Sequence, residues 1–505
     1  MRKGKFVKIA AFAVMLCLAF SVAGCGTGNS DNAGNDPPPD GQTLLPVGTE
    51  GYYTLVQKTI DGYDVTSTFV QNYLRLHNGK AYTVGIDFTG REEQEGTYRV
   101  ADTAVEVVMG VKTYSYTFDA AAETLTYTGK VNRRQVSMQY KYNKNFTAST
   151  ADGGVDFVSQ TELFGEPKEE NFYNYCPSAI MEGNNIMHIW YCANKVSGNV
   201  TDYVAYRKGE LNGAGKWVFG EKQIVLAPTA GTWDERHTCD PSVVKGDFSM
   251  GGEKYAYLMA YLGCKTSDNT RNEVGIAVAK EPQGPWVKVD ALNPIANFYA
   301  SPEYNEKSWG YGQPSLISSD NAGKVLLLYS KGVTSGTFAY LEEWDFSDLD
   351  HAKKLRETRL SDNGVVNASG EKDVINNADF AYDPHLKRMY CIKEDFGYPT
   401  DGGVDWIAGS NTLLYIDLGD KGIDALFGTH RWEVGGQITR NTTGFFRNHN
   451  MGIVTDVYGK LCDPYKVPVV YTMSDSKEAY PDWNLGGQWP ALHTYRIHGW
   501  VLDVK

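Results

Sequence analysis

Two aspartates stand at the start of short apolar segments that recur along the chain. Asp240 opens the segment DPSVV, and Asp379 opens DFAYD. Two glutamates, Glu235 in WDERH and Glu303 in SPEYN, lie on polar stretches near the starts of such segments. Carboxyl groups that are held at a fixed separation can divide proton transfer between them, because one gives a proton while the other takes one. We therefore take these four residues as the catalytic candidates.

Polar and aromatic residues that could contact a ligand lie near these carboxylates. His237 precedes Asp240 by three residues, and Gln313 and His449 open two further apolar segments. Imidazole and amide groups can hydrogen-bond to ligand hydroxyl groups. Trp233 and Trp309 precede apolar segments, and their rings could stack on a partly apolar ligand face. We expect all five to bind substrate.

Each of these assignments has a structural alternative. An aspartate before Pro-Ser, as at Asp240, is also a turn residue that caps its own backbone. Asp383-Pro384 could supply the structural turn near Asp379. The two glutamates could be solvated loop charges, and the two tryptophans could be core residues.

The apolar segments belong to an internal repeat. Its five units start at Cys176, Asp240, Gln313, Asp379 and His449, and successive starts lie about 64 to 73 residues apart. Each unit has a short apolar strand, a turn and a second strand rich in Tyr, Leu or Met. Short strands repeated at this period predict a radial β architecture, in which inner strands begin around one axis. The sequence therefore predicts an all-β protein whose residues 150–505 form a five-bladed β-propeller.

Residues 49–147 predict a second, smaller β domain. About eight short strands follow one another, many of them joined by tight turns such as Asn78-Gly79. Residues 113–118 alternate Thr or Ser with an aromatic residue, which is the period of a half-buried strand. The GYY opening, the NGK hairpin and the GTY strand resemble the small lipocalin-like β-barrel domains of bacterial lipoproteins. The resemblance implies a barrel, which we expect to be a spacer or accessory binding module.

The first residues resemble a bacterial lipoprotein signal. Residues 1–24 combine four basic side chains with an apolar run, and the segment ends in SVAG before Cys25. The resemblance implies that Cys25 is lipidated and becomes the mature N-terminus. Residues 25–48 are rich in Gly, Asn, Asp and Pro, which is typical of a flexible tether. We expect a lipid-anchored bacterial protein that faces outside the cytoplasm.

The net charge limits which ligands the protein can bind, and the cysteine spacing bears on disulfides and metal sites. The formal net charge is −13, and loss of the four basic residues of the signal would leave −17. A body this acidic argues against nucleic acid as the partner. Cys176 and Cys239 adjoin unit starts, so either they approach each other near the axis or they are buried free thiols. No spacing indicates a metal site or cofactor, and no dedicated loop for an axial Ca²⁺ is visible.

The second repeat unit carries a family resemblance. CDPSVV, YLMAYLG and VGIAVAKEPQGPW resemble a blade of the five-bladed glycosidases, the superfamily of glycoside hydrolase families 43, 32, 62 and 68. The resemblance implies a carbohydrate site at the propeller axis and hydrolysis of arabinose- or xylose-type glycans. It implies that Asp240 is the base and that Asp379 orients and tunes the site.

The chain departs from the family pattern where the general acid is expected. The fifth unit offers His449 and Asn450 in place of a glutamate. Glu303 and Glu235 are the available substitutes. The leading interpretation is a glycosidase, and a glycan-binding lipoprotein on a degenerate propeller is the alternative. A surface scaffold in which the barrel binds the ligand is a third.

Overall fold

The computed structural model describes residues 50–101, 104–149, 153–165, 172–196, 199–398, 407–474 and 494–503. The expected signal segment, Cys25 and the tether lie outside these residues. Strands dominate the described chain, and its helical elements are short: η1 (Thr66–Thr68), η3 (Leu349–His351), η5 (Gly419–Phe427) and α1 (Arg440–Thr443). None of the helices in the described ranges is long and apolar enough to cross a membrane.

Residues 51–142 form a closed antiparallel barrel, as predicted. Eight strands pair in sequence order and β1 closes on β9, while the short β2 pairs with β1. The strands are β1 (Gly51–Ile60), β2 (Tyr63–Asp64), β3 (Phe69–His77), β4 (Lys80–Asp87), β5 (Gly90–Ala101), β6 (Ala104–Met109), β7 (Lys112–Asp119), β8 (Thr124–Val131) and β9 (Arg134–Tyr142). Asn78 and Gly79 join β3 to β4 with φ of 48° and 72°, the backbone of a tight two-residue hairpin.

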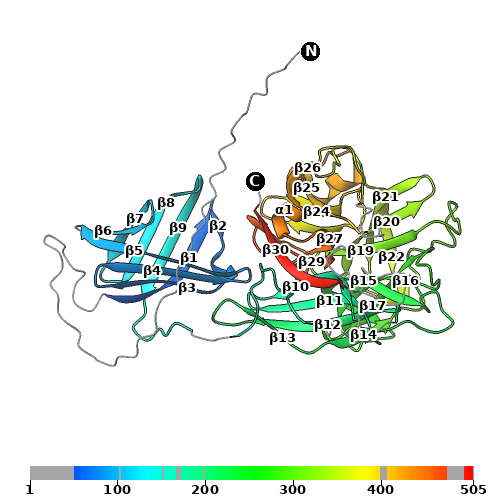
Figure 1. Cartoon of the computed structure of the whole chain (residues 1–505), viewed down its shortest axis with the longest axis horizontal. Coiled ribbons are helices and arrows are strands. Elements are labelled where there is room, and N and C mark those ends of the chain that lie inside the picture. The colour runs from blue at the N-terminus through cyan, green and yellow to red at the C-terminus, as the bar shows by residue number, and fades with distance from the viewer. Residues whose placement is uncertain are drawn as a thin grey trace, which may run out of the picture. The chain divides into compact units, whose positions relative to one another are not determined.

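The described residues after the barrel form five antiparallel sheets, which are the five predicted blades (Figure 1). Blade one contains β10 (Asn174–Glu182), β11 (Ile186–Asn194), β12 (Asp202–Leu211), β13 (Trp217–Phe219) and β14 (Gln223–Leu226). Blade two contains β15 (His237–Met250), β16 (Glu253–Cys264), β17 (Glu273–Ala279) and β18 (Val287–Lys288). Blade three contains β19 (Gly310–Ser318), β20 (Lys324–Val333), β21 (Gly336–Asp345) and β22 (Lys353–Arg359).

Blades four and five complete the propeller. Blade four contains β23 (Asp379–Asp383), β24 (Arg388–Glu394), β25 (Asn411–Asp417) and β26 (Glu433–Ile438). Blade five contains β27 (Arg447–Ile453), β29 (Lys466–Ser474) and β30 (Arg496–Asp503). The short β28 (Thr455–Asp456) leaves blade five and pairs in parallel with β10 of blade one.

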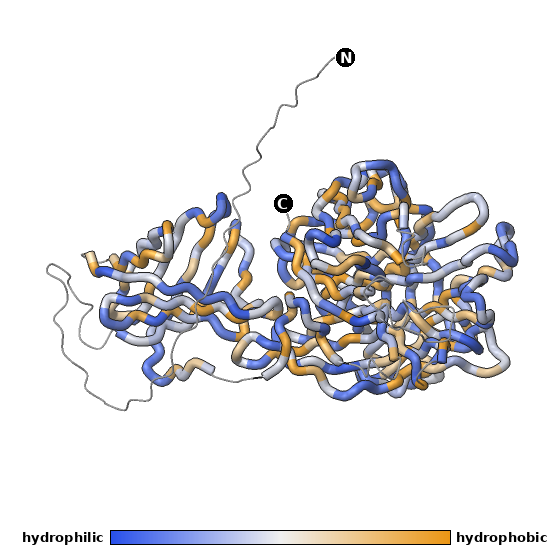
Figure 2. The backbone as a smooth tube through the Cα atoms, viewed as in Figure 1, coloured by the Kyte–Doolittle hydropathy of each residue, from blue (hydrophilic) through white to orange (hydrophobic). Residues whose placement is uncertain are grey.

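The blades pack on each other through strands that are apolar on both faces. Every residue of β17 is buried, and so is nearly all of β11 and β20. A strand sandwiched between two neighbouring sheets has no solvent face, so it loses the alternation of a half-buried strand. Figure 2 shows hydrophobic stretches along the blades and hydrophilic ones at many of the turns.

The ring closes between the last strand and the start of the propeller domain. Val158 pairs in parallel with Gly499 on β30, and the Leu163 N–H donates to the Ile497 carbonyl at 2.9 Å. These contacts join the segment around residues 158–163 to β30, the last strand of blade five. Closure covers a sheet edge that would otherwise expose unpaired backbone groups.

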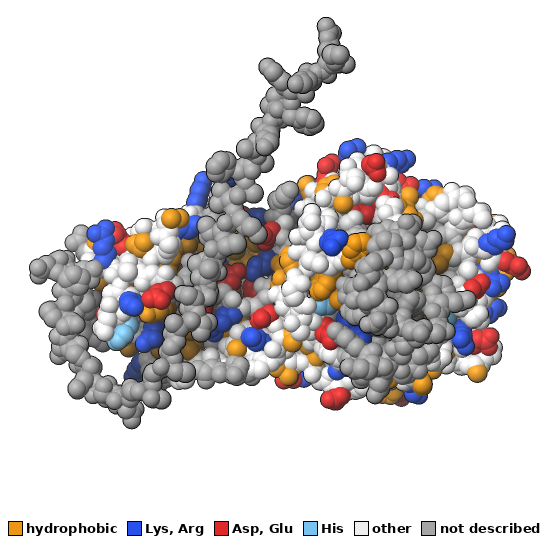
Figure 3. Space-filling view, viewed as in Figure 1, with side chains coloured by type: hydrophobic (Ala, Val, Ile, Leu, Met, Phe, Trp, Pro, Cys, Tyr) orange, Lys and Arg blue, Asp and Glu red, His pale blue; other side chains and the backbone are white. Residues whose placement is uncertain are grey.

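Acidic and basic side chains are interspersed over the described part of the visible surface (Figure 3). Many of them form exposed ion pairs, such as Lys208 with Glu210 and Lys280 with Glu253. Exposed pairs of this kind each stabilise a fold by at most about 1 kcal/mol. The burial between blades therefore dominates the stability of the propeller.

Candidate functional site

A small cavity lies at the propeller axis. Among the residues that line it, one in each blade has the same unusual backbone conformation. These five ring residues have φ between 43° and 51°, in the left-handed region: Cys176, Asp240, Gln313, Asn377 and Asn450. Strand pairing slips beside the ring residue in four blades, between Tyr175 and Ser178 in blade one, for example. A bulge of this kind bends a strand and turns a side chain that would otherwise follow the pleat.

The ring position differs from the sequence-based one in two blades. In blade four it is Asn377, two residues before Asp379, and in blade five it is Asn450, directly after His449. In the first three blades the ring residue is followed by proline, whereas Ala378 and Met451 follow the two asparagines. The prediction that Asp379 and His449 occupy the equivalent positions is therefore wrong. The ring residue lies two residues before Asp379 in blade four and one residue after His449 in blade five.

Asp240 is the one carboxylate among the five ring residues. Burial raises the pKa of its carboxyl to about 6. A hydrogen bond from the Cys176 thiol opposes the rise, the charge of Asp202 adds to it, and His449 and the Gln313 backbone N–H oppose it. A carboxyl group that is half protonated near pH 6 can exchange a proton under mild conditions.

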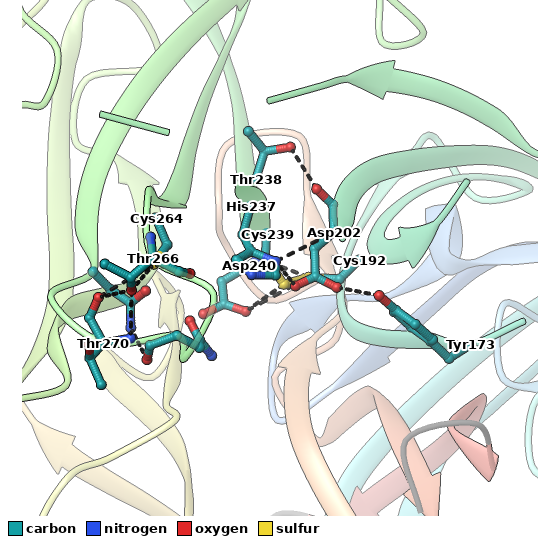
Figure 4. A network of polar contacts seen from close by, with 12 residues as sticks. Tyr173, Cys192, Asp202, His237, Thr238, Cys239, Asp240, Cys264, Thr266 and Thr270 are labelled. Carbon is teal, nitrogen blue, oxygen red and sulfur yellow. Dashed lines mark hydrogen bonds and ion pairs between the residues drawn. A yellow bond between two sulfur atoms is a disulfide. The ribbon is translucent and has the colours of Figure 1, made fainter. Parts of the chain in front are cut away.

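A buried polar chain lies behind Asp240 and includes His237 (Figure 4). The Nδ1 atom of His237 lies 2.8 Å from Oδ2 of Asp202, at the start of β12. The Tyr173 hydroxyl donates to Oδ1 of Asp202 at 2.9 Å. Asp202 therefore has partners on both oxygens, and its charge acts on Asp240 through the protein interior.

A second buried carboxylate, Glu394 at the end of β24, supports the fifth blade. It accepts hydrogen bonds from the Asn450 backbone N–H at 2.7 Å, the Asn377 amide at 2.5 Å and the Tyr398 hydroxyl at 3.0 Å. Its Oε1 atom also lies 2.5 Å from Nδ1 of His449. Glu394 thus pairs with His449 and fixes two ring residues at once.

Asp379 lines the cavity, but its carboxylate is engaged between blades. The Ser315 hydroxyl donates to Oδ1 at 2.6 Å, and the Ile453 N–H donates to Oδ2 at 2.7 Å. Burial raises the pKa of the Asp379 carboxyl to about 6, against these hydrogen bonds. The side chain therefore links blades three, four and five, which suits an orienting role better than direct chemistry.

The cavity itself is small, and both polar and apolar residues line it. Its volume is about 40 Å³, and its rim includes the Gln313 side chain, whose Oε1 accepts the Asn377 N–H at 2.9 Å. A space of this size has room for water, whereas pockets for small-molecule ligands usually exceed about 300 Å³. A sugar would therefore have to bind outside this cavity, with only its reacting end near Asp240.

The two candidate glutamates are not among the residues that line the cavity. Glu303 is half exposed and forms an ion pair with the buried Lys331. The hydrogen bond from Lys331 holds the pKa of Glu303 below its usual range. Glu235 is exposed, and it accepts the Gly231 N–H at 3.0 Å within its own loop. Neither carboxylate therefore lies at the axial cavity, where a general acid would have to meet the leaving oxygen.

The two tryptophans pack against the fold. Trp233 lies against Tyr261, and its ring fills the space over Gly263 and Gly275, where a β-carbon would come within 2.1 and 2.4 Å of it. Trp309 packs against the cysteines beside the cavity. Both rings are partly exposed, so each has a free portion that a ligand could reach.

Cys176 and Cys239 approach each other near the axis, which is one of the two alternatives expected, but they are not bonded to each other. Cys239 forms a disulfide with Cys192, at the C-terminal part of β11, with a Cα–Cα distance of 5.1 Å. Cys176 stays a buried free thiol beside them. The sulfurs of all three and a carboxylate oxygen of Asp240 lie within 4.8 Å of one another.

Sequence reasoning missed the buried residues that support the site. Asp202 and Glu394 lie at the ends of strands that are not inner strands, where a charge normally signals a solvated turn. Only the neighbouring polar run KED hints that Glu394 is unusual. Together the described residues provide two groups for proton transfer near one axis, Asp240 and the His449–Glu394 pair.

Comparison with known proteins finds similar folds at low identity. A family 117 glycoside hydrolase of the marine bacterium Zobellia galactanivorans aligns with a TM-score of 0.43 and 12% identity, over 68% of this chain and 88% of that one. The α-L-arabinofuranosidase of Podospora anserina, solved with cellotriose, gives 0.40 and 12%, over 66% and 91%. The endo-arabinase of Bacteroides thetaiotaomicron gives 0.36 and 10%, over 66% and 94%. No protein family model matches this chain, and no curated protein matches it.

Proposed function

We propose that this chain is a glycosidase that hydrolyses O-glycosidic bonds of arabinose- or xylose-type glycans at the propeller axis. The observation that carries the proposal is the single ring carboxylate, Asp240, whose pKa is raised to about 6 beside a buried His–Glu pair. Above pH 6 Asp240 is mostly ionised and can take a proton from water. Glycoside hydrolysis by inversion needs such a base on one side of the bond and an acid on the other.

His449 is the proton donor in this proposal. Glu394 lies 2.5 Å from its Nδ1 atom and is completely buried, so the pair is held away from water. In this proposal the imidazole gives a proton to the leaving oxygen. His449 takes the place of the glutamate that the resemblance implies, and Glu394 keeps its ring in position.

Glycan binding without hydrolysis is the second candidate. The other four ring residues carry no carboxylate, and Asp379 is engaged by Ser315 and Ile453. A propeller with one free carboxylate at its axis could recognise sugar hydroxyl groups through Asp240 and Gln313 alone. Such a protein would bind the same oligosaccharides and release nothing.

One experiment separates the two candidates. The full chain, purified in detergent, is incubated with arabinan, xylan, fructan and galactan oligosaccharides, and reducing ends and bound sugar are both measured. We expect release by the wild type, loss of release in Asp240→Asn, and unchanged release in Glu303→Gln, which lies outside the cavity lining. Binding without release by the wild type would establish the non-catalytic candidate.

We also propose that Cys25 is lipidated and anchors the protein to the bacterial membrane, facing outside the cytoplasm. The support is the basic and apolar run of residues 1–24 that ends before Cys25. A tether of about 20 residues would leave the barrel and the propeller free to reach polymeric glycans.

A further inference from the structure

Three cysteine sulfurs and one carboxylate lie close together beside the cavity. A disulfide needs only two of the sulfurs, so one thiol and the carboxylate remain beside it. The Sγ atoms of Cys176, Cys192 and Cys239 and an oxygen of Asp240 lie within 4.8 Å of one another. They come from three strands, β10, β11 and β15. All three cysteines are buried, and Figure 4 shows Cys192, Cys239 and Asp240 converging.

We propose that these four side chains bind one thiophilic divalent cation, of the Zn²⁺ or Cd²⁺ kind, once the Cys192–Cys239 disulfide is reduced. Oxidised protein then holds the disulfide, and reduced protein holds the cation. The two states exclude each other, because the disulfide occupies two of the four donor atoms.

The donor set fits such a cation in number and spacing. Zinc is usually bound by four ligands in a tetrahedron with Zn–S distances of about 2.3 Å, which places the sulfurs about 3.8 Å apart. The donor atoms lie within 4.8 Å of one another, and reduction would let the two bonded sulfurs, Cys192 and Cys239, move apart toward this spacing. Thiolates prefer soft cations and disfavour Mg²⁺ and Ca²⁺, so the ion that the site selects is a thiophilic one.

One backbone donor would support a thiolate at Cys192, whereas burial and the neighbouring Asp240 raise the pKa of the Cys176 thiol. The Asp240 backbone N–H points at Cys192 Sγ across 3.0 Å, and such a donor stabilises negative sulfur. The Cys176 backbone N–H donates to Thr472 Oγ1 at 3.1 Å, which fixes β10 at the ring.

Formation of the site balances as follows. A phosphine reductant and water convert the disulfide into two thiols and a phosphine oxide. The cation then displaces a proton from each thiol that it binds, and from Asp240 when that carboxyl is protonated. Metal binding would occupy Asp240, so it would also block the proposed hydrolysis; that consequence rests on the proposed function, and the binding itself does not.

The test uses full chain in which Cys17→Ser and Cys25→Ser remove the two thiols of the N-terminal segment. The protein is reduced with a phosphine and titrated with Cd²⁺, and the sulfur-to-cadmium charge-transfer absorbance is followed. Cys176→Ser removes one donor. Cys391→Ser is the matched control, because Cys391 is also a buried free thiol but lies on β24 in another cluster.

We expect one equivalent of Cd²⁺ to bind after reduction and none before it. Cys391→Ser should bind like the parent, and Cys176→Ser should bind at least tenfold more weakly. Absence of binding after reduction, or equal binding by Cys176→Ser and its parent, would overturn the proposal. An equal loss in Cys391→Ser would do so too, because the cation would then not distinguish the two thiols.

A second variant guards against a Cys176→Ser protein that fails to fold. Asp240→Asn keeps all three sulfurs and removes only the carboxylate oxygen. We expect it to bind Cd²⁺ more weakly than the parent with the same absorbance per bound ion, since the thiolates alone give the signal. Affinity equal to that of the parent would exclude Asp240 as a ligand and contradict the proposed site.

Discussion

Two aspartates at the axis have the same raised pKa and different surroundings. Burial raises the pKa of both Asp240 and Asp379 to about 6. Asp379 receives a hydroxyl and a backbone N–H from neighbouring blades, whereas Asp240 belongs to the ring itself. The residue type and the pKa are therefore the same for the two aspartates. Their hydrogen-bond partners and positions are what distinguish their roles.

Replacement of Asp240 by asparagine should stabilise the fold at neutral pH. Its pKa is 3.8 in the reference state and about 6 in the folded protein, so the folded state binds the proton more tightly. The stability that this carboxyl contributes is present below pH 4 and is lost as the pH rises through 6. The neutral amide escapes that loss, so Asp240→Asn should gain about 3 kcal/mol in free energy of unfolding at pH 7.5.

Urea denaturation of both proteins at pH 5 and pH 7.5 checks this prediction. The gain should be clearly smaller at pH 5, where Asp240 is mostly protonated in the folded wild type. A loss of stability at pH 7.5, or a gain that does not change with pH, would contradict the assignment of a buried, proton-exchanging carboxyl group.

Glu394→Gln should destabilise the protein, because it removes the charged partner of His449 and disturbs the acceptors of Asn377 and Asn450. Loss of one member of a buried pair costs about 3 kcal/mol. Glu303→Gln is the control, since it breaks a half-exposed pair and should change the free energy of unfolding by less than about 1 kcal/mol. Equal effects of the two substitutions would show that Glu394 is not a structural carboxylate.

At the scale of elements, the left-handed ring residues determine what faces the axis. In four blades the strand pairing breaks beside the ring residue, and all five ring residues line one cavity. Glycine adopts this backbone without strain, while a β-branched residue does not.

Substitutions at Asn450 test this role of the backbone. Asn450→Gly keeps the N–H that donates to Glu394 and should change the free energy of unfolding by less than about 1 kcal/mol. Asn450→Val should cost about 2 kcal/mol, because its side chain clashes at φ of 43°. Thermal unfolding of both variants measures the difference, and equal melting temperatures would refute it.

The element scale also shows what the sequence could predict. The repeat predicted five blades, and Asn78-Gly79 predicted a hairpin, because turn chemistry and strand period are local properties. The ring positions were found in the three blades where proline follows, at Cys176, Asp240 and Gln313. They were missed at Asn377 and Asn450, which no proline follows. There the pattern indicated the nearby ionisable residues Asp379 and His449 as the unit starts instead.

Contacts between strands that are distant in sequence could not be predicted. Cys239 pairs with Cys192 because β11 reaches the axis beside β15, and no spacing in the sequence encodes that neighbourhood. Glu394 supports the ring from the second strand of its blade, a position that the repeat pattern treats as ordinary core. Such residues are found only once the blades are placed around their axis.

At the scale of the whole molecule, the acidic body and the N-terminal segment govern where the protein acts. A net charge of −13 favours neutral ligands over polyanions. From the resemblance of residues 1–25 to a lipoprotein signal, we propose that the hydrolysis takes place outside the cytoplasm.

Cys25→Ser should release the protein from the membrane fraction of bacterial cells that express it. The substitution removes the thiol that would carry the proposed lipid anchor. Fractionation followed by immunoblotting measures the change, with Cys391→Ser as the control that should stay with the membrane. Equal membrane association of the two variants would contradict the lipid anchor.

The most direct test of the central claim is chemical rescue of Asp240→Gly on the best substrate of the oligosaccharide panel. Glycine tolerates φ of 45° at this position, so the ring should keep its backbone when the carboxylate is removed. We predict that kcat falls at least about 1000-fold and that added formate restores part of it by supplying the missing base. Activity of Asp240→Gly within tenfold of the wild type would show that Asp240 is not the base.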